Sequence, residues 1–408
     1  MSQKLRLFYY ALGPANMIKP YSHWVKGEDD PSRTTITYTA QFYDVCRALD
    51  AEVYVLSSCS EKQLLHDGQF TIEHRPNLEL GKNLSGFLYS LGQLWYMLRI
   101  IATAVRFRAN VAIVGQGTRY RTLYSLLPLF GIQVIWSLHC VLWPKYNPPK
   151  GIKLWRFRLT QNFFAKNCAA ILTHSDDIIE QIAQLTGESH PPIVQFSPIY
   201  CRSQFDEIDE PDAIRSPFRV MFAGQIERFK GVFDLLEIAK RFADEGRQAI
   251  IFELCGDGSA LESLRLAAKE AGVEPSFVCY GYCQKQQMRE VYNRSHVVIV
   301  PTRTEFVEGF NKVVIEGVLS GRPVITSAVC PSLPCVTEAV VEVPPDDPNA
   351  YGDAVLKLCD DREFYEEKRR GCLGLQEQFY DISRGWGTKL KSILVAIQES
   401  REIGEIRE

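Results

Sequence analysis

Apolar and polar positions follow two alternating patterns along the first half of the chain. Short runs rich in β-branched and aromatic residues predict strands, and between them apolar residues recur at helical spacing. The expected strands are Leu5–Ala11, Glu52–Ser57, Val111–Val114, Ile132–Ser137, Ala169–Thr173 and Ile193–Phe196. The expected helices span 35–49, 84–106, 119–129, 151–166 and 175–186. Strands that alternate with helices in this way predict a parallel sheet with crossover helices.

The same alternation starts again after a polar stretch at 201–217. This stretch carries five acidic residues and two prolines, which is typical of a linker. Beyond it the expected strands are Phe218–Ala223, Ala249–Leu254, Phe277–Tyr280, His296–Val300 and Pro323–Thr326. Helices are expected near 231–245, 260–271 and 311–320, and most of 348–400 is expected to be helical.

This organisation predicts two Rossmann-like, doubly wound α/β domains that face each other across a central cleft. The N-terminal domain is expected at 1–200, the linker at 201–217 and the C-terminal domain at 218–380. A C-terminal helix within 381–408 could pack back on the N-terminal domain. Because the carboxyl ends of parallel strands open into such a cleft, a ligand site is expected there.

The composition is that of a soluble globular protein, with 46% apolar and 23% charged residues. No run of about 18 uncharged apolar residues predicts a membrane span. Residues 1–10 hold a short apolar run without a small-residue cleavage site, so they predict a first strand rather than a signal peptide. The twelve cysteines lack zinc-knuckle spacing, which favours free thiols in a reducing cytoplasm over metal ligands.

Charge is distributed unevenly between the two halves of the chain. Residues 1–200 carry 20 basic and 14 acidic side chains, whereas the remainder carries 26 basic and 35 acidic ones. Residues 80–175 contain twelve basic residues and no acidic residue. This asymmetry indicates an anionic partner for the first domain, which could be a membrane surface, a phosphorylated acceptor or nucleic acid.

The most informative segment for chemistry runs from Glu308 to Glu316, directly after an expected strand. If most of it is helical, the two carboxylates lie roughly 12 Å apart along the axis, at ~1.5 Å per residue. That separation suits the hydroxyl groups of a hexose and a ribose at opposite ends of a diphosphate. Amide groups at the helix start could receive the diphosphate itself. The alternative interpretation is an ordinary helix with an acidic first turn and one exposed glutamate.

Three further segments carry glycines directly after expected strands. In Phe222–Gly231 a glycine turn at Gly224 is followed by Lys230, so that backbone and a cation could approach a phosphate. Gly256 lies in a second glycine turn, and Tyr282 follows Gly281 in a third segment that could frame a nucleobase. Taken singly, each is also compatible with an ordinary βα turn.

In this order and spacing, the four segments resemble the second domain of the family 4 retaining glycosyltransferases, which have the GT-B fold. The resemblance covers about 218–345 strongly and the whole chain loosely. It implies that Lys230 holds the donor diphosphate, that Glu316 binds the ribose hydroxyls and that Glu308 lies beside the transferred sugar. The residues implied to line the sugar and phosphates are Gly309, Phe310, Asn311 and Lys312.

The first domain is similar to the family at two places. Ser137-Leu138-His139-Cys140 follows a strand where the family places a histidine that reaches the donor sugar, which implies this role for His139. The glycine turn after the first strand is recognisable at Gly13. Without the wider pattern, His139 would be interpreted as a hydrogen-bonded interior histidine.

The chain departs from the family pattern at Gln225, where the family usually has an arginine directly after the glycine. A cation near the β-phosphate is therefore missing unless Arg228 supplies it from the same loop. No Asp-x-Asp metal motif is present, so Lys230 and helix amides are expected to neutralise the leaving group without a metal ion. The resemblance implies retention of anomeric configuration, and the sequence contains no obvious covalent nucleophile.

Several alternatives remain open at this level. A nucleotide-sugar epimerase or hydrolase of the same fold would consume the donor without an alcohol acceptor. A catalytically weak nucleotide-sugar-binding protein would accord with Gln225. An NAD-dependent enzyme with paired Rossmann domains is disfavoured, because the first turn lacks G-x-G-x-x-G.

The acceptor is not encoded in a recognisable motif. A glycan or a lipid-linked polysaccharide precursor is expected, with UDP-glucose as the default donor and no nucleic acid partner. Residues 84–106 and 150–166 interleave basic with aromatic and aliphatic side chains, as interfacial helices do on anionic lipid. The expected location is the cytoplasm, with the possibility of peripheral attachment to the inner face of the membrane. The alternative is that both helices simply pack on the first sheet.

Overall fold

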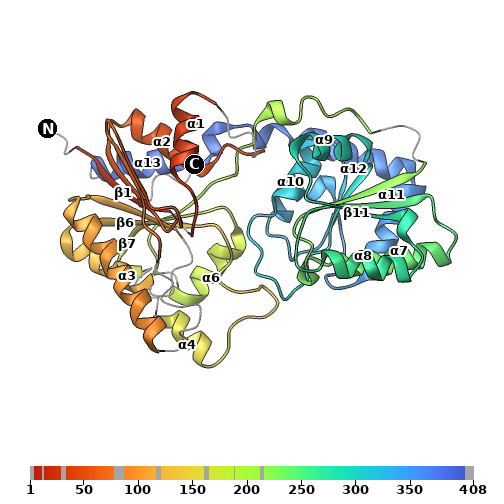
Figure 1. The fold of residues 1–408 in the computed structure, drawn as a ribbon, viewed down its shortest axis with the longest axis horizontal. Helices are drawn as coiled ribbons and strands as arrows, with labels where there is room; N and C mark the ends of the chain where they lie inside the picture. The colour runs from red at the N-terminus through yellow and green to blue at the C-terminus, as the bar shows by residue number, and fades with distance from the viewer. Residues whose placement is uncertain are drawn as a thin grey trace. The chain divides into compact units, whose positions relative to one another are not determined.

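The computed structural model describes residues 4–11, 13–28, 34–77, 87–115, 121–159, 165–187, 189–211 and 216–399. The chain forms two compact units, which are described separately (Figure 1). Unit 1 comprises 1–140, 149–200 and 381–408, and unit 2 comprises 141–148 and 201–380. Each unit is an α/β structure with its own sheet and its own hydrophobic core.

The eight-stranded sheet of unit 1 has the order β3-β4-β2-β1-β5-β6-β7-β8. Its strands are β1 (Arg6–Tyr10), β2 (Glu52–Ser57), β3 (Gln63–Asp67), β4 (Phe70–His74), β5 (Val111–Gly115), β6 (Gln133–Leu138), β7 (Cys168–Thr173) and β8 (Ile193–Gln195). All neighbours pair in parallel except β3 and β4, which form an antiparallel hairpin. The six expected strands are confirmed, and the hairpin was missed. No residue of β3 is buried, so its sequence has no apolar face to reveal it.

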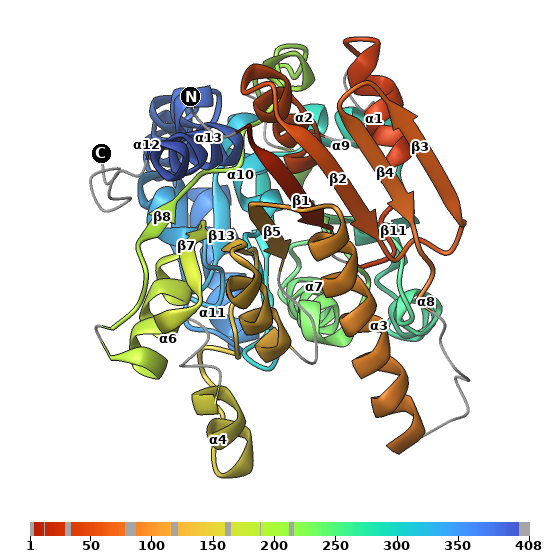
Figure 2. The same ribbon diagram turned by 90° about the vertical axis from the view of Figure 1, so that its left-hand side faces the viewer.

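Helices cover both faces of this sheet (Figure 2). On one face lie α1 (Ile18–Val25), α2 (Tyr38–Ala48) and the C-terminal α13 (Trp386–Gln398), all contributing to one core. The other helices of the unit are α3 (Phe87–Arg106), η1 (Arg121–Phe130), α4 (Ile152–Leu159) and α6 (Asp176–Thr186). Of the α-helix expected at 119–129, residues 119–120 lie outside the described residues, and the rest is the 3₁₀ helix η1, which contains Pro128. Of the helix expected at 151–166, residues 160–164 lie outside the described residues.

The six-stranded sheet of unit 2 is entirely parallel, with the order β11-β10-β9-β12-β13-β14. Its strands are β9 (Phe218–Ala223), β10 (Ile250–Cys255), β11 (Phe277–Gly281), β12 (Val297–Val300), β13 (Val324–Thr326) and β14 (Val340–Glu342). The five expected strands are confirmed. The unexpected β14 is only three residues long and gives little periodic signal.

The helices of unit 2 form two layers. Helices α7 (Val232–Asp244), α8 (Leu261–Glu270) and α11 (Pro348–Asp360) share one core, while α9 (Lys285–Arg294), α10 (Lys312–Leu319) and α12 (Arg362–Leu375) lie across the sheet (Figure 1). Helix α9 was missed because eight of its ten residues are not buried. Short 3₁₀ turns are η2 (Arg202–Gln204), η3 (Arg228–Lys230), η4 (Glu274–Ser276), η5 (Leu333–Cys335), η6 (Thr337–Ala339), η7 (Glu377–Phe379) and η8 (Ile382–Arg384).

Both sheets are doubly wound, because the strand order reverses direction within each. In unit 1 the reversal lies between β1 and β5, and in unit 2 it lies between β9 and β12. Loops that leave neighbouring strands at such a point diverge to opposite faces and open a crevice at the carboxyl edge of the sheet. A ligand site in unit 2 is therefore expected at the β9–α7 and β12–α10 loops.

The described part of the stretch expected to be a linker packs on unit 2. Arg202 donates two hydrogen bonds to the carboxylate of Glu377, at 2.9 and 2.6 Å, and Arg369 forms an ion pair with Glu210 at 2.8 Å. No helix within the described residues is both long and apolar enough to cross a bilayer. None of the twelve cysteines forms a disulfide.

Candidate functional site in unit 2

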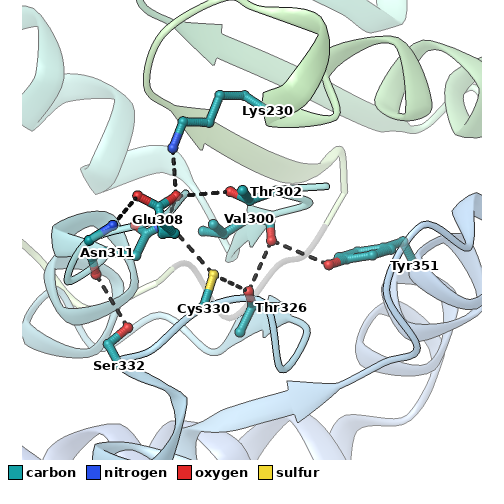
Figure 3. Close-up of polar contacts among 10 residues, drawn as sticks. Lys230, Val300, Thr302, Glu308, Asn311, Thr326, Cys330, Ser332 and Tyr351 are labelled. Carbon is teal, nitrogen blue, oxygen red and sulfur yellow. Dashed lines mark hydrogen bonds and ion pairs between the residues drawn. The ribbon is translucent and has the colours of Figure 1, made fainter. Parts of the chain in front are cut away.

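An ion pair connects the two loops that diverge at the switch point of unit 2. Lys230, at the end of the β9–α7 loop, donates from Nζ to Oε2 of Glu308 at 2.5 Å (Figure 3). Both side chains are largely shielded, with 14% and 11% of their surface exposed. The ammonium group also lies 4.1 Å from the ring centroid of Phe306. A cation and a carboxylate are thus held together where a diphosphate sugar could approach.

Three polar groups besides Lys230 donate to the carboxylate of Glu308, one of them the backbone N–H of Gly309, which donates to Oε1 at 3.2 Å. Thr302 Oγ1, just beyond β12, donates to Oε2 at 3.3 Å, and Asn311 Nδ2 donates to the same atom at 3.3 Å. Figure 3 shows these groups converging on Glu308 from different parts of the chain. Hydrogen bonds of this kind restrict the rotation of the carboxylate.

A buried layer beneath Glu308 supports this arrangement. Thr326 Oγ1 donates to Val300 O at 2.9 Å, while Cys330 Sγ accepts from Asn311 Nδ2 at 3.7 Å. Tyr351 donates to the same Val300 carbonyl from the other side, at 3.3 Å (Figure 3). Burial raises the pKa of the Cys330 thiol to about 12, so the thiol stays neutral at physiological pH. Cys330 is therefore a packing and hydrogen-bonding group here.

The segment between the two glutamates is helical only over its second half. Helix α10 begins at Lys312, so the loop to Asn311 is extended and the separation expected from an almost continuous helix does not apply. The first turn of α10 contains no acidic residue, which excludes the interpretation of Glu308 as a first-turn acid. Glu316 lies on the second turn and accepts from Tyr292 Oη at 3.3 Å.

The start of α10 is a candidate anion site. The N-cap residue Asn311 makes no side-chain hydrogen bond to the first turn, and Lys312 is exposed. Amide groups at a helix start point away from the helix and favour negative charge. Gly309 and Phe310 are half-buried in the loop between Glu308 and this helix start.

The loops after β9, β10 and β11 are joined by backbone hydrogen bonds. Gly224 N donates to Cys255 O at 3.0 Å, and Gly256 N donates to Gly281 O at 2.8 Å. A Cβ at Gly256 would lie 1.7 Å from Gly224 O, and its φ of +148° also disfavours other residues. Gly256 is thus required for the close approach of two loops. The exposed Tyr282 follows directly on the third loop.

Gly231, like Gly256, permits a close approach of two loops, here at the end of the β9–α7 loop that carries Lys230. Its φ is +75°, and a Cβ there would meet the carbonyl oxygen of Pro301 at 2.1 Å. The β9–α7 loop therefore rests directly on the start of the β12–α10 loop. This contact sets the position from which Lys230 reaches Glu308.

Gln225, which stands where the family usually has an arginine, and Arg228, the expected substitute, are both exposed. Gln225 follows the glycine turn, and the guanidinium of Arg228 lies over the ring of Phe233, 4.1 Å from its centroid. Between them, Glu227 accepts hydrogen bonds from Ser259 Oγ and N, each at 2.7 Å, and these lower the pKa of its carboxyl group. Arg228 could leave this exposed stack at small cost, because such contacts contribute about 0.5–1 kcal/mol.

His139 and Gly13 belong to unit 1. His139 is half-buried directly after β6, where its ring lies 4.6 Å from that of Tyr38 and Nε2 is 2.8 Å from Ser137 Oγ. Trp386 Nε1 donates to the same hydroxyl at 2.9 Å, which leaves the hydroxyl proton available for His139. Gly13, with φ +70°, lies in the turn beyond β1, and its carbonyl accepts from Ser58 N at 3.3 Å.

The structure thus brings Gly224, Lys230, Gly256, Glu308 and Glu316 onto adjacent loops and one helix of unit 2. Sequence reasoning missed Thr302, Phe306 and Ser259 around this site, and Trp386 beside His139. Thr302 could have been found from its place directly after β12. Trp386 could not, because it lies 249 residues from Ser137. Among the described residues, no cluster of three His, Cys, Asp or Glu side chains could hold a metal ion.

The second half of the chain matches a known protein family. Residues 217–361 match the family described as Glycosyl transferases group 1. A 2-deoxystreptamine N-acetyl-D-glucosaminyltransferase from Streptomyces fradiae is 29% identical over 111 residues, which cover 27% of this chain and 26% of that protein. A 2-deoxystreptamine glucosyltransferase from Streptomyces kanamyceticus is 28% identical over 126 residues, which cover 30% and 32%. The chain therefore spans about a quarter to a third of these relatives.

Solved structures are similar over nearly the whole chain. The α,α-trehalose 6-phosphate synthase of Burkholderia multivorans aligns with a TM-score of 0.72 at 12% identity, covering 98% of this chain and all of that one. Anabaena HepE in complex with UDP aligns with a TM-score of 0.65 at 12% identity, covering 97% and 100%. At this identity the likeness shows the fold. The chain has the two-sheet architecture of GT-B glycosyltransferases, and its residues 217–361 match a glycosyltransferase domain.

Proposed function

We propose that the protein is a retaining glycosyltransferase that moves a hexose from a nucleotide-diphosphate donor, with UDP-glucose as the first donor to test. The observation that carries the proposal is the Lys230–Glu308 pair at the switch point of unit 2, within a segment that matches a glycosyltransferase domain. The matching relatives transfer glucosyl or N-acetylglucosaminyl groups by name, which supports a sugar donor.

Lys230 has a direct chemical role in this proposal. Departure of a nucleoside diphosphate develops negative charge on phosphate oxygens, which a fixed cation stabilises. An ammonium group has three donor hydrogens, so Lys230 can contact a phosphate while it keeps Glu308. The amides at the start of α10 would share this charge, which makes a metal ion unnecessary.

The remaining site residues have proposed roles in orientation. Glu308 would accept hydrogen bonds from the transferred sugar, and Glu316 would accept them from the ribose. Gly309, Phe310, Asn311 and Lys312 would line the space between these two carboxylates. His139 of unit 1 would reach the donor sugar, held at its angle by Ser137 and Tyr38. No protein side chain is assigned as a covalent nucleophile.

The proposed acceptor is a glycan or a lipid-linked polysaccharide precursor, and the proposed setting is the cytoplasm. Twelve free thiols fit a reducing compartment. The experiment that tests the function follows UDP release from UDP-glucose with a panel of such acceptors, in the presence and absence of a chelator. We expect acceptor-dependent release that survives the chelator and is lost in Lys230→Ala.

A nucleotide-sugar-binding protein of low activity is the second candidate, and the exposed Gln225 is the observation that favours it. Saturable donor binding without UDP release over the whole acceptor panel would support this candidate. Donor consumption that needs no acceptor would instead indicate an epimerase or a hydrolase of the same fold.

A further inference from the structure

Helix α4 presents an apolar face to solvent. Ile152, Trp155 and Leu159 are 77%, 61% and 52% exposed, and their spacing places them on one side of the helix. A helix of a globular protein normally turns such a stripe toward the core. Here the stripe points outward and is flanked by the exposed cations Lys153 and Arg158.

Helix α3 has a second apolar face in addition to the one that packs on the sheet. Its inward side buries Tyr96, Ile100 and Ala104, as expected for a helix that covers the sheet. Its outward side exposes Leu91, Trp95 and Leu98, by 43%, 52% and 43%. Packing on the first sheet therefore does not explain the exposed apolar residues of α3. The guanidinium of Arg99 lies 4.6 Å from the ring centroid of Trp95 on this outward side.

The helices that carry the two exposed faces extend to the same end of unit 1. In both Figure 1 and Figure 2, α4 and the first half of α3 lie at the lower end of that unit, below the sheet. We call these six side chains the α3–α4 surface: Leu91, Trp95, Leu98, Ile152, Trp155 and Leu159. Figure 2 shows the two helices apart from each other at this end, so the surface consists of two exposed apolar patches. Apolar patches of this kind mark an interaction surface more often than single exposed residues do.

Charge narrows the choice of partner. The surface lies within residues 80–175, which contain twelve basic residues and no acidic residue. A second copy of the chain would bring these cations against one another, which disfavours self-association through this surface. Nucleic acid would pair with the cations but would leave the aliphatic side chains of Ile152 and Leu159 without apolar contacts. Anionic lipid satisfies both kinds of group, because headgroups meet cations and acyl chains meet apolar side chains.

We propose that the α3–α4 surface docks unit 1 on an anionic lipid bilayer. Trp155 and its neighbours enter the boundary between headgroups and acyl chains, while Lys153 and Arg158 remain at the level of the lipid phosphates. The attachment is peripheral and reversible. The attachment involves no residue of the Lys230–Glu308 site, so it can be tested independently of the proposed function.

The first test is flotation of the full chain with vesicles of phosphatidylcholine alone or mixed with phosphatidylglycerol, at low and high salt. We expect binding to the anionic vesicles only, weakening as salt rises because screening shortens the reach of charge. Lys153→Gln with Arg158→Gln should lower binding about 25-fold, at ~1 kcal/mol for each charge. The control pair Lys240→Gln with Lys269→Gln, exposed on unit 2, changes net charge equally and should leave binding unchanged.

The second test addresses the apolar contribution. Changing Ile152, Trp155 and Leu159 together to Ser should abolish flotation without lowering the melting temperature, because all three are exposed. Leu266→Ser, which is 58% exposed on α8, is the control and should float like the unaltered chain. Lipids brominated on the acyl chain should quench tryptophan emission, and Trp155→Phe should retain binding while losing part of the quenching.

Several results would overturn the proposal. Equal binding to neutral and anionic vesicles, or no binding to either, would remove the role of charge. Unchanged flotation of the triple variant would show that α4 does not enter the lipid. Concentration-dependent dimerisation that disappears in the triple variant would assign the surface to a second copy of the chain.

Discussion

The ion pair between Lys230 and Glu308 is the central interaction of the site at the scale of single residues. It joins two loops that are 78 positions apart in the sequence, and it is shielded from water on most sides. Removing one member leaves the other charge poorly solvated, which costs more than losing an exposed pair. Substitutions here therefore report on both ligand binding and local order.

Lys230→Ala should weaken donor binding and lower turnover together. Loss of a charge-assisted contact to phosphate costs about 1.5–3 kcal/mol of binding free energy. This corresponds to a roughly 10- to 100-fold larger dissociation constant. Calorimetry with UDP-glucose and a turnover assay measure the two effects. Lys240→Ala, an exposed lysine on α7, is the matched control. Unchanged donor affinity and rate in Lys230→Ala would remove this residue from the site.

Glu308→Gln and Glu316→Gln should have different consequences. Glu316 is expected to face the ribose, so its substitution should weaken UDP and UDP-glucose alike. Glu308 is expected to face the sugar, so its substitution should leave UDP binding nearly intact while it depresses turnover. Calorimetry with both ligands distinguishes the two, and the reverse pattern would exchange the assignments.

At the scale of secondary-structure elements, close contacts between loops determine where the site residues lie. Gly231 ends the β9–α7 loop against Pro301, and Gly256 brings the β10 loop onto Gly224. In unit 1, α13 supplies Trp386, whose hydrogen bond to Ser137 holds the hydroxyl beside His139.

Gly231→Ala should destabilise the protein more than Gly246→Ala. Both glycines have similar positive φ values, 75° and 71°, so the backbone cost of a Cβ is similar, at about 1 kcal/mol. Only at Gly231 would the new Cβ also collide with Pro301 O, which adds a further ~1–3 kcal/mol. Chemical denaturation measures the difference, and equal losses would show that the two loops can separate at little cost. The Gly231 variant should also bind donor more weakly.

Trp386→Phe should lower turnover while leaving UDP binding unchanged. Phenylalanine keeps most of the apolar packing but cannot donate to Ser137, so the Ser137–His139 interaction loosens. Stability should fall by about 1 kcal/mol, as for a single buried hydrogen bond. Trp24→Phe is the control, because Trp24 Nε1 donates to Asp44 at an exposed position, at 2.7 Å. If UDP binding fell with turnover, Trp386 would have a general structural role.

At the scale of the whole molecule, a ligand that binds only the folded protein should raise its melting temperature. At a donor concentration 100 times the dissociation constant, the stabilisation is about 2.7 kcal/mol. That corresponds to a shift of roughly 5–10 °C for a unit of this size. A screen of nucleotide sugars should identify the base and the sugar by the largest shift. If none of them raised the melting temperature, the proposed donor site would be wrong.

Much of the fold could be predicted from the sequence, because burial imposes a local periodicity. All eleven expected strands are present, since parallel strands covered on both faces are continuous apolar runs. Three missed elements have burial that leaves a weak pattern: the exposed strand β3, the short β14 and the polar helix α9. Strand β4 and helix α1 were missed as well. The described part of the segment expected to be an α-helix at 119–129 belongs to the 3₁₀ helix η1, which contains Pro128.

The chemistry of the site was only partly accessible from the sequence. Glycine turns after strands and two glutamates eight positions apart are local signals, so Lys230, Glu308 and Glu316 could be named as candidates. Which of these groups touch is a property of the doubly wound topology, which brings the β9 and β12 loops to adjacent positions. The pairing of Lys230 with Glu308 therefore required the structure.

The same division applies to the first domain. Its amino-acid sequence determined the excess of positive charge and the apolar content of residues 84–106 and 150–166. Only the tertiary structure shows that α3 and α4 expose apolar side chains. The sequence of a helix with apolar residues on more than one face does not indicate which face packs on the sheet. Likewise Trp386 acquires its place beside Ser137 only when α13 folds onto unit 1. The periodic spacing of apolar residues depends on neighbouring positions in the sequence, whereas contacts between distant residues arise from the packing of whole elements.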